Sequence, residues 1–170
     1  MRVYRLTLLF LFCLLFNAGH SYSEETLLPG KSYGEYEMGA HLESIISIAG
    51  KNNCMSFKSN GMVFKDVFKV NLSHDIIYDL VLTCYSSGTT FFFKNNKLVC
   101  IVVKGNSARI EGSVSLKKGL ESQRMLFGNS HAYRVVKYKS VLLLYLKYGV
   151  AFIDDNKDQM IDGFIVFQPK

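Results

Sequence analysis

Residues 79–103 contain three short runs rich in β-branched and aromatic residues, and this pattern constrains the fold more than any other part of the chain. The runs are Asp79–Tyr85, Thr89–Lys94 and Lys97–Val103, and the connections between them are Ser86-Ser87-Gly88 and Asn95-Asn96. Strands joined by such short turns pair with their neighbours as an antiparallel meander. We therefore expect an antiparallel sheet at the centre of the fold.

Cys54, Cys84 and Cys100 offer one disulfide and one remaining thiol. In the predicted meander Cys84 and Cys100 lie on the first and third strands, roughly 10 Å apart. A disulfide needs α-carbons within about 7 Å of each other. Pairing of Cys54 with either Cys84 or Cys100 is therefore favoured, and three reduced thiols are the alternative.

Two helices are expected. Apolar residues recur at helical spacing over Met38–Ala49, and Gly50 follows as a stop signal. A weaker helical pattern covers Ser115–Phe127 and ends before Gly128. With the meander, these helices predict an α+β fold with an antiparallel sheet.

The rest of the chain is expected to form five further strands, after a short polar segment without regular structure that we call the polar lead. The apolar run Leu142-Leu143-Leu144 indicates a strand that is covered on both faces. The polar lead is Glu24–Lys31, and the strands are expected at Met62–Val70, Tyr133–Lys139, Val141–Tyr148, Val150–Ile153 and Phe164–Gln168.

The order of a helix followed by strands occurs twice, in residues 33–105 and 110–168. The offset from Leu42-Glu43-Ser44 to Leu120-Glu121-Ser122 is also the offset from Gly50 to Gly128, whereas the later match of Gly88–Phe91 with Gly149–Phe152 has a smaller offset. The first copy would therefore carry about 17 extra residues between its helix and its hairpin. We interpret the pattern as a tandem duplication of a helix-plus-meander unit, with chance convergence as the alternative.

Residues 1–23 are typical of a secretory signal peptide. Arg2 and Arg5 precede the apolar run Leu8–Phe16, and small polar residues follow up to Ser23. Nine apolar residues are too short to cross about 30 Å of hydrocarbon, which argues against an uncleaved membrane anchor.

Cleavage before Glu24 is favoured, and cleavage after Ala18 or Gly19 is the alternative. The mature protein, residues 24–170, is then a single periplasmic or secreted domain with no transmembrane segment. Loss of two arginines with the leader leaves 18 basic against 14 acidic residues. The lysines are scattered without a basic stripe, which argues against nucleic acid as a partner. A modestly basic surface is compatible with an acidic partner or with an anionic envelope polymer.

The segment Asp154–Asp162 is the one candidate metal site. Asp154, Asn156, Asp158 and Asp162 stand at loop positions 1, 3, 5 and 9, and the Met160 carbonyl stands at position 7. Calcium takes six to eight oxygen ligands, and alternating spacing in a tight loop supplies them. The segment is therefore a candidate for a structural Ca²⁺ site. A polar hairpin turn without an ion is the alternative, because Asp and Asn are favoured in turns for conformational reasons.

The flanks of this segment, Val150–Ile153 and Phe164–Phe167, are strand-like. The segment resembles the calcium hairpin loops of integrin-type (FG-GAP) repeats, which use acidic or Asn residues at positions 1, 3, 5 and 9. It departs from an EF-hand loop in having Gln159 at position 6 and Ile165 at position 12.

The order of elements also resembles a known architecture. Gly39–Ile46 with Gly50, and Phe91–Phe93 with Lys97–Val103, are similar to the helix-then-meander unit of the β-lactamase-inhibitory-protein-like fold. The small outer-membrane assembly lipoproteins of the SmpA/OmlA type carry one such unit. The resemblance covers most of residues 33–168, and the chain lacks the proline that the family pattern places soon after the helix. The resemblance implies a binding module that offers a concave sheet to another protein.

The residue patterns typical of catalytic sites find little support in this sequence. His41, His74 and His131 are far apart and lack metal-ligand spacing. The neighbouring carboxylates Glu35 and Glu37 are typical of a solvated face. Neither a nucleophile elbow nor a phosphate-binding loop is present. We predict that the protein is not an enzyme, and a hydrolase using Cys84 or Cys100 with a distant histidine is the least favoured reading.

Together these features predict an exported protein-binding module. Its most specific form is a periplasmic inhibitor or immunity protein against an envelope-targeting enzyme. An envelope assembly or structural accessory protein is the alternative.

Overall fold

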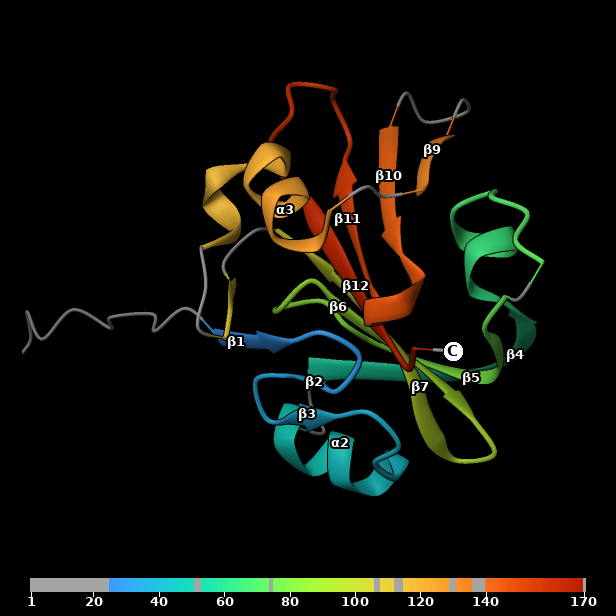
Figure 1. The fold of residues 1–170 in the computed structure, drawn as a ribbon. Coiled ribbons are helices and arrows are strands. Elements are labelled where there is room, and N and C mark those ends of the chain that lie inside the picture. Colours follow the sequence, from blue (N-terminus) through green and yellow to red (C-terminus); the bar gives the residue numbers. More distant parts are fainter. Residues whose placement is uncertain are drawn as a thin grey trace, which may run out of the picture.

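The β-structure of the protein consists of one large sheet and one small sheet (Figure 1). The computed structural model describes residues 25–50, 53–73, 75–105, 108–111, 115–128, 131–135 and 140–169. The large sheet is eight-stranded and antiparallel throughout. Its spatial order is β4 (Cys54–Met62), β5 (Ile77–Cys84), β6 (Thr89–Lys94), β7 (Lys97–Lys104), β12 (Gly163–Phe167), β11 (Val150–Asp154), β10 (Ser140–Tyr145) and β9 (His131–Val135). The predicted α+β class and the predicted meander of residues 79–103 are confirmed.

The large sheet is built from two similar halves that meet at β7 and β12. In the first half the helix α2 (Leu42–Ala49) precedes β4–β7, and in the second half α3 (Leu120–Phe127) precedes β9–β12. Residues matched in the sequence occupy equivalent places: Gly50 and Gly128 follow the helices, and Gly88 and Gly149 precede β6 and β11. The repeated order expected from the sequence is therefore present in the topology.

The small sheet was not expected. Its order is β3 (Tyr36–Glu37), β2 (Ser32–Tyr33), β1 (Glu25–Leu28) and β8 (Ala108–Ile110), and β1 runs parallel to β8. The region read as a polar lead therefore forms a strand, and its Leu27 is completely buried. Strands of two to four residues leave no periodic pattern that a sequence could reveal. Tyr33 packs edge-on against Phe164 of β12, with ring centroids 5.1 Å apart.

The two faces of the large sheet are covered differently. We call the first the helical face, since Ile45 of α2, Leu120 of α3 and Leu27 of the small sheet pack there in one cluster. We call the second the groove face, and it is covered by the connection from Val63 to Ile76. Figure 1 shows the helices and this connection on opposite sides of the sheet.

The run Leu142-Leu143-Leu144 alternates between these two faces. Leu142 and Leu144 belong to the groove-face cluster and Leu143 to the helical-face cluster, and all three are buried. The prediction that this strand is covered on both faces is confirmed.

Both helices are shorter than expected. The predicted helix over Met38–Ala49 begins only at Leu42, because His41 is extended and forms a bridge with Lys97. The predicted helix over Ser115–Phe127 is interrupted at Gly119, where φ is +82°. A single 3-10 turn, η3 (Leu116–Lys118), precedes this break and α3 follows it.

The strand predicted over Met62–Val70 is wrong. Met62 is the last residue of β4, and Val63–Val67 forms a π-helical turn, η2. The Asp75 carboxylate holds this turn in place by accepting hydrogen bonds from the backbone N–H groups of Phe64 (2.8 Å) and Lys65 (2.7 Å). The conformation of this turn therefore depends on a carboxylate that lies well beyond it in the sequence. The local hydrophobic periodicity, from which the strand was predicted, contains no information about that contact.

β4 was not among the expected strands, because Asn60-Gly61 is a dipeptide typical of a turn. Gly61 instead lies inside the strand, at a bulge between Lys58 and Gly61. A β-carbon at Gly61 would stand 2.6 Å from the Tyr78 hydroxyl oxygen, so this close approach requires glycine.

The remaining boundaries shift by a few residues. The strand expected over Val141–Tyr148 ends at Tyr145 and continues as a 3-10 turn, η5 (Leu146–Tyr148). The predicted signal peptide and the second half of the predicted strand Tyr133–Lys139 lie outside the described residues. Among the helices that are described, none has the length and apolar character to span a bilayer.

Candidate binding face and acidic loop

One disulfide joins the outermost two strands of the first half. Cys54 of β4 and Cys84 of β5 are register partners with α-carbons 4.1 Å apart. This is one of the two pairings that the sequence favoured. Cys100 is a free thiol, completely buried on the groove face, and burial raises its pKa well above the ordinary value. A bonded sulfur and a buried, protonated thiol both lack the thiolate character that a cysteine nucleophile needs.

The groove face contains a cavity of about 590 Å³ that opens to solvent. Its lining includes Thr90, Phe92 and Val102 from the central strands β6 and β7. Val67 and Phe68 line it from the connection after β4, and Leu142 and Ile153 line it from the second half of the sheet. Lys104, Asp155 and Asp162 add the charged groups. The cavity is therefore apolar with both signs of charge among its lining residues.

The accessible part of the groove face carries short side chains. A row of register partners crosses seven strands, from Met55 on β4 to Leu144 on β10. Between these ends the row consists of Thr83, Thr90, Val102, Ile165 and Ala151. Thr83, Thr90 and Val102 are half-buried, and Ile165 and Ala151 are completely buried. A partner surface can therefore reach Thr83, Thr90 and Val102, whereas the chain itself already covers Ile165 and Ala151.

Exposed apolar side chains continue this face towards the β4 edge. Met55 and Phe57 pair with Thr83 and Val81, which places them on the groove face, and they are 59% and 48% exposed. Tyr85, at the turn after β5, is 72% exposed. Scattered exposed apolar residues need no explanation, but contiguous ones on one face are typical of an interaction surface.

Two loops lie together at one end of the sheet. The Lys104 N–H donates to the Gly88 carbonyl (3.0 Å), and the Gly105 N–H donates to the Asp162 carbonyl (2.6 Å). The turn of residues 85–88 and the segment Asp154–Asp162, which we call the acidic loop, thus flank the same end of β7. This end also contributes Lys104 to the groove.

The acidic loop is folded around its first carboxylate. Asp154 is 1% exposed at the end of β11, and it accepts the N–H groups of Lys157 (2.6 Å) and Gln159 (3.1 Å). Asp162 accepts the Asp155 N–H at 2.7 Å. Lys157 and Gln159 both have positive φ, +66° and +68°. Gln159 therefore adopts at position 6 the left-handed conformation for which an EF-hand uses glycine.

Three of the five predicted calcium ligands converge. Asp154, Asp158 and Asp162 each place a carboxylate oxygen within 4.8 Å of the other two. Asn156 instead hydrogen-bonds to Asp158, accepting its N–H and donating to its carboxylate. Met160 donates its N–H to Asp158 at 2.8 Å. No lysine or arginine among the described residues forms an ion pair with these carboxylates, so their charge is left for a cation or for solvent.

The acidic loop also supports the second helix. The Gln159 carbonyl accepts the Leu120 N–H at 2.9 Å, at the first residue of α3. A β-carbon at Gly119 would stand 2.9 Å from this same carbonyl oxygen. The conformation of the loop is therefore coupled to the start of α3.

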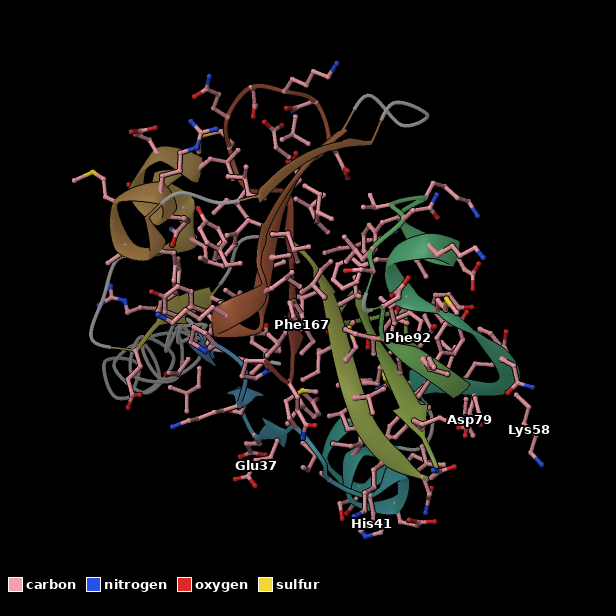
Figure 2. All side chains as sticks on the ribbon, turned by 45° about the vertical axis from the view of Figure 1, so that its right-hand side comes forward. Glu37, His41, Lys58, Asp79, Phe92 and Phe167 are labelled. Atoms are coloured by element: carbon pink, nitrogen blue, oxygen red, sulfur yellow. A yellow bond between two sulfur atoms is a disulfide. The ribbon has the colours of Figure 1, made fainter. Side chains whose placement is uncertain are left out.

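The other residues singled out in the sequence lie away from the groove. Glu35 and Glu37 are exposed, as expected for a solvated face, and Glu37 belongs to the small sheet. His41 precedes α2, and Figure 2 shows both Glu37 and His41 away from Phe92 and Phe167. His74 and the ring of His131 lie outside what the structure describes.

Sequence reasoning missed the groove residues. Thr83, Thr90 and Val102 stand on three different strands, so only the pairing register assembles them. The available signal was only a threonine or valine near one end of each predicted strand, at residues 83, 90 and 102. The charged end of the groove was partly found, because Asp162 was already named as a candidate ligand.

Comparisons of the chain with protein-family models, with curated proteins and with solved structures find no match. The function proposed below therefore depends on the residues and geometry of this chain alone.

Proposed function

We propose that the protein is exported and binds another protein through the groove face, as an inhibitor or immunity protein against an envelope-targeting enzyme. The observation that carries the proposal is the accessible first half of the groove face. Met55 is exposed there, and its row neighbours Thr83, Thr90 and Val102 are only half-buried. Continuous sheets are rigid platforms, and a preformed surface lowers the entropic cost of binding.

Export is supported by two independent features. The leader-like residues 1–23 follow the pattern of a secretory signal. The Cys54–Cys84 disulfide is compatible with an oxidising compartment such as the periplasm or the extracellular space.

Inhibition would use the loops at the end of β7. The turn of residues 85–88 presents the exposed Tyr85, and the acidic loop presents the partly exposed Met160. Loops of this kind, held by a sheet, can enter a substrate cleft and block it without chemistry. Tyrosine and methionine are both enriched at protein interfaces.

The acidic loop is proposed to hold a structural Ca²⁺ ion. The donor set fits, because Asp154, Asp158 and Asp162 offer hard carboxylate oxygens within 4.8 Å of one another. The ion would neutralise three carboxylates and fix the loop beside the groove. Its proposed role is to order the loop, because extracellular sites of this kind bind calcium at only about 0.1 to 1 mM.

Affinity capture from envelope extracts and from the secretions of competing strains tests this proposal. The bait is the purified protein, and the eluate is read by mass spectrometry with calcium and again with a chelator. One stoichiometric enzyme that is inhibited on binding supports the proposal. Capture of assembly-complex subunits alone would favour the accessory alternative, and hydrolytic activity of the protein itself would contradict both.

A pair of variants assigns the captured enzyme to the groove face. Thr83→Arg places a long charged side chain in the accessible part of the row, next to Met55, so capture is expected to fall at least tenfold, roughly 1.4 kcal/mol or more. Glu37→Arg adds a similar side chain to the exposed small sheet and serves as the matched control. Equal capture by both variants would exclude the groove face as the binding surface.

A further inference from the structure

The large sheet ends at β4, and this edge is open. β4 pairs with β5 on one side, and on its other side no strand among the described residues pairs with it. Figure 2 shows Lys58 of β4 extending away from the body of the fold, whereas Phe92 lies within the sheet. An open strand edge presents unpaired backbone groups that another extended chain can bind.

The disulfide identifies which backbone groups face outward. Opposed residues in an antiparallel pair lie about 5.5 Å apart when they exchange hydrogen bonds and about 4.5 Å apart when they do not. Cys54 and Cys84 are 4.1 Å apart between α-carbons, so they form a non-hydrogen-bonded pair. The N–H and C=O of Cys54 therefore point away from β5, and the period of two extends this to Ser56 and Lys58.

These outward groups have no partner in the described part of the chain. Within that part, no backbone hydrogen bond outside the β4–β5 ladder involves Cys54, Ser56 or Lys58. Ser56 and Lys58 are both exposed. The bulge between Lys58 and Gly61 disturbs the edge only beyond Lys58. A regular, accessible edge thus remains from Cys54 to Lys58.

The side chains of this edge differ between its two faces. Met55 and Phe57 are exposed on the groove face, whereas Ser56 and Lys58 lie on the opposite face. Lys58 forms no ion pair among the described residues. An added strand would therefore meet apolar side chains on one face and an uncompensated ammonium on the other.

We propose that β4 binds an extended segment of the partner protein as an additional strand, through the backbone groups of Cys54, Ser56 and Lys58. The inference rests on the proposed protein-binding function and names its mode. The partner segment alternates apolar residues, which pack on Met55 and Phe57, with acidic residues, one of which pairs with Lys58. This is strand addition to a sheet edge, in which the main chain supplies affinity and alternate side chains supply specificity.

A second copy of this chain fits the edge less well. Self-pairing centred on Ser56 would place Lys58 opposite Cys54 of the other copy and leave both ammonium groups without a carboxylate. Residues 24–170 are also basic on balance, with 18 basic against 14 acidic residues, so two copies repel weakly. Charge complementarity therefore favours an acidic partner segment.

The test uses a short blocked peptide that alternates valine and glutamate, titrated into the purified ¹⁵N-labelled protein. The amides of Cys54, Ser56 and Lys58 are expected to shift together and to gain protection from hydrogen exchange. A peptide of the same length that alternates valine and lysine is expected to bind about tenfold more weakly, and Lys58→Glu is expected to reverse this preference. No binding of the valine–glutamate peptide at millimolar concentration would overturn the proposal.

A proline variant tests the backbone role directly. Ser56→Pro removes one outward N–H, and proline is tolerated at an edge strand whose N–H faces solvent. Loss of this hydrogen bond should weaken the peptide about tenfold, whereas the matched Ser56→Ala variant keeps the N–H and should bind within about twofold of the parent. Thermal unfolding of both variants verifies that each is folded. Equal binding by the two variants would overturn the proposal.

Two further outcomes separate this inference from the proposed function. If Ser56→Pro still captures the envelope enzyme undiminished, the binding function stands and the edge inference fails. If sedimentation shows a dimer of the protein that Ser56→Pro dissociates, the edge binds a second copy and the partner-strand inference fails.

Discussion

The two halves of the large sheet share an order of elements and differ in what lies between them. In the first half the long connection Val63–Ile76 separates β4 from β5, and in the second half only residues 136–139 separate β9 from β10. The second half instead carries the acidic loop between β11 and β12. The strands of both halves form one continuous sheet. The groove lies where the connection Val63–Ile76 and the acidic loop meet this sheet. Differences between the halves, more than their likeness, therefore determine the candidate site.

The largest expected difference between the halves comes from the disulfide, which only the first half has among the described residues. The double variant Cys54→Ala, Cys84→Ala is expected to lose about 3 to 4 kcal/mol of unfolding free energy, because the cross-link closes a loop of about 30 residues. Urea unfolding measures this loss. Reduction should destabilise the parent by a similar amount and leave the variant unchanged. A loss below about 1 kcal/mol would mean that the paired strands β4 and β5 need no cross-link.

The helices provide a second contrast at one matched position. Ile45 of α2 and Gln123 of α3 each directly follow the matched Leu-Glu-Ser residues, and both are completely buried. The Gln123 amide has no hydrogen-bond partner among the described residues, and such a group costs about 1 to 3 kcal/mol. We expect Ile45→Gln to destabilise the protein by about 3 kcal/mol and Gln123→Leu to stabilise it by about 1 to 2 kcal/mol.

Thermal and urea unfolding of these two variants check the expectation. Destabilisation by Gln123→Leu would contradict it and would indicate that the amide is satisfied in solution, for example by a buried water.

Calcium binding is expected to stabilise the protein through the acidic loop, which belongs to the second half of the large sheet. Extracellular sites bind at about 0.1 to 1 mM, so 10 mM calcium is expected to add about 1.4 to 2.7 kcal/mol of stability. Asp158→Asn removes one exposed carboxylate charge while keeping an acceptor for the Met160 N–H, and it should abolish most of this gain. Thermal unfolding with calcium, with magnesium and with chelator measures it. Equal stabilisation of the parent and the variant would exclude the acidic loop as the site.

The smallest expected effect on stability concerns the Asp79 carboxylate, which binds the turn between β6 and β7. The Asn95 N–H donates a hydrogen bond to the Asp79 carboxylate (3.0 Å), and the Lys94 ammonium nitrogen lies 3.4 Å from an oxygen of the same carboxylate. Both contacts lower the pKa of Asp79 below its ordinary value of 3.8. A lowered folded-state pKa contributes stability that is present above pH 3.8 and is lost as the pH falls through the folded value. Ser140 takes the equivalent place in the second half.

Asp79→Asn should therefore make unfolding slightly less dependent on pH below pH 4 and leave the acidic loop unaffected. Urea unfolding across this range, with the parent protein as the reference, measures the difference. An unchanged pH dependence would mean that Asp79 contributes equally in the folded and unfolded states.

The parts predicted from the sequence are those whose causes are local. The turns Ser86-Ser87-Gly88 and Asn95-Asn96 set the meander of β5, β6 and β7, and Asn95 and Asn96 have the positive φ values, +51° and +63°, of a tight hairpin turn. The spacing of Asp154, Asp158 and Asp162 predicted their convergence because all three belong to one short loop.

The parts that were missed have distant causes. The π-helical turn after Met62 depends on Asp75, and the small sheet depends on the pairing of β1 with β8, which lies beyond the whole first half of the large sheet in sequence. The groove depends on the registers of four or more strands at once. Turn chemistry and periodicity carry no information about such pairings.

The position of β12 has a consequence for how the chain acquires its structure. β7 and β12 form the join between the halves, and β12 follows every other strand in the sequence. Until residues 163–167 have emerged, β7 and β11 each lack one neighbour, and the buried row through Ile165 is missing. A chain that folds as it emerges from its N-terminus would thus carry two unfinished sheets until β12 pairs with β7 and β11. The β7–β12 pairing spans about 60 residues, and contacts between residues so far apart in sequence form slowly.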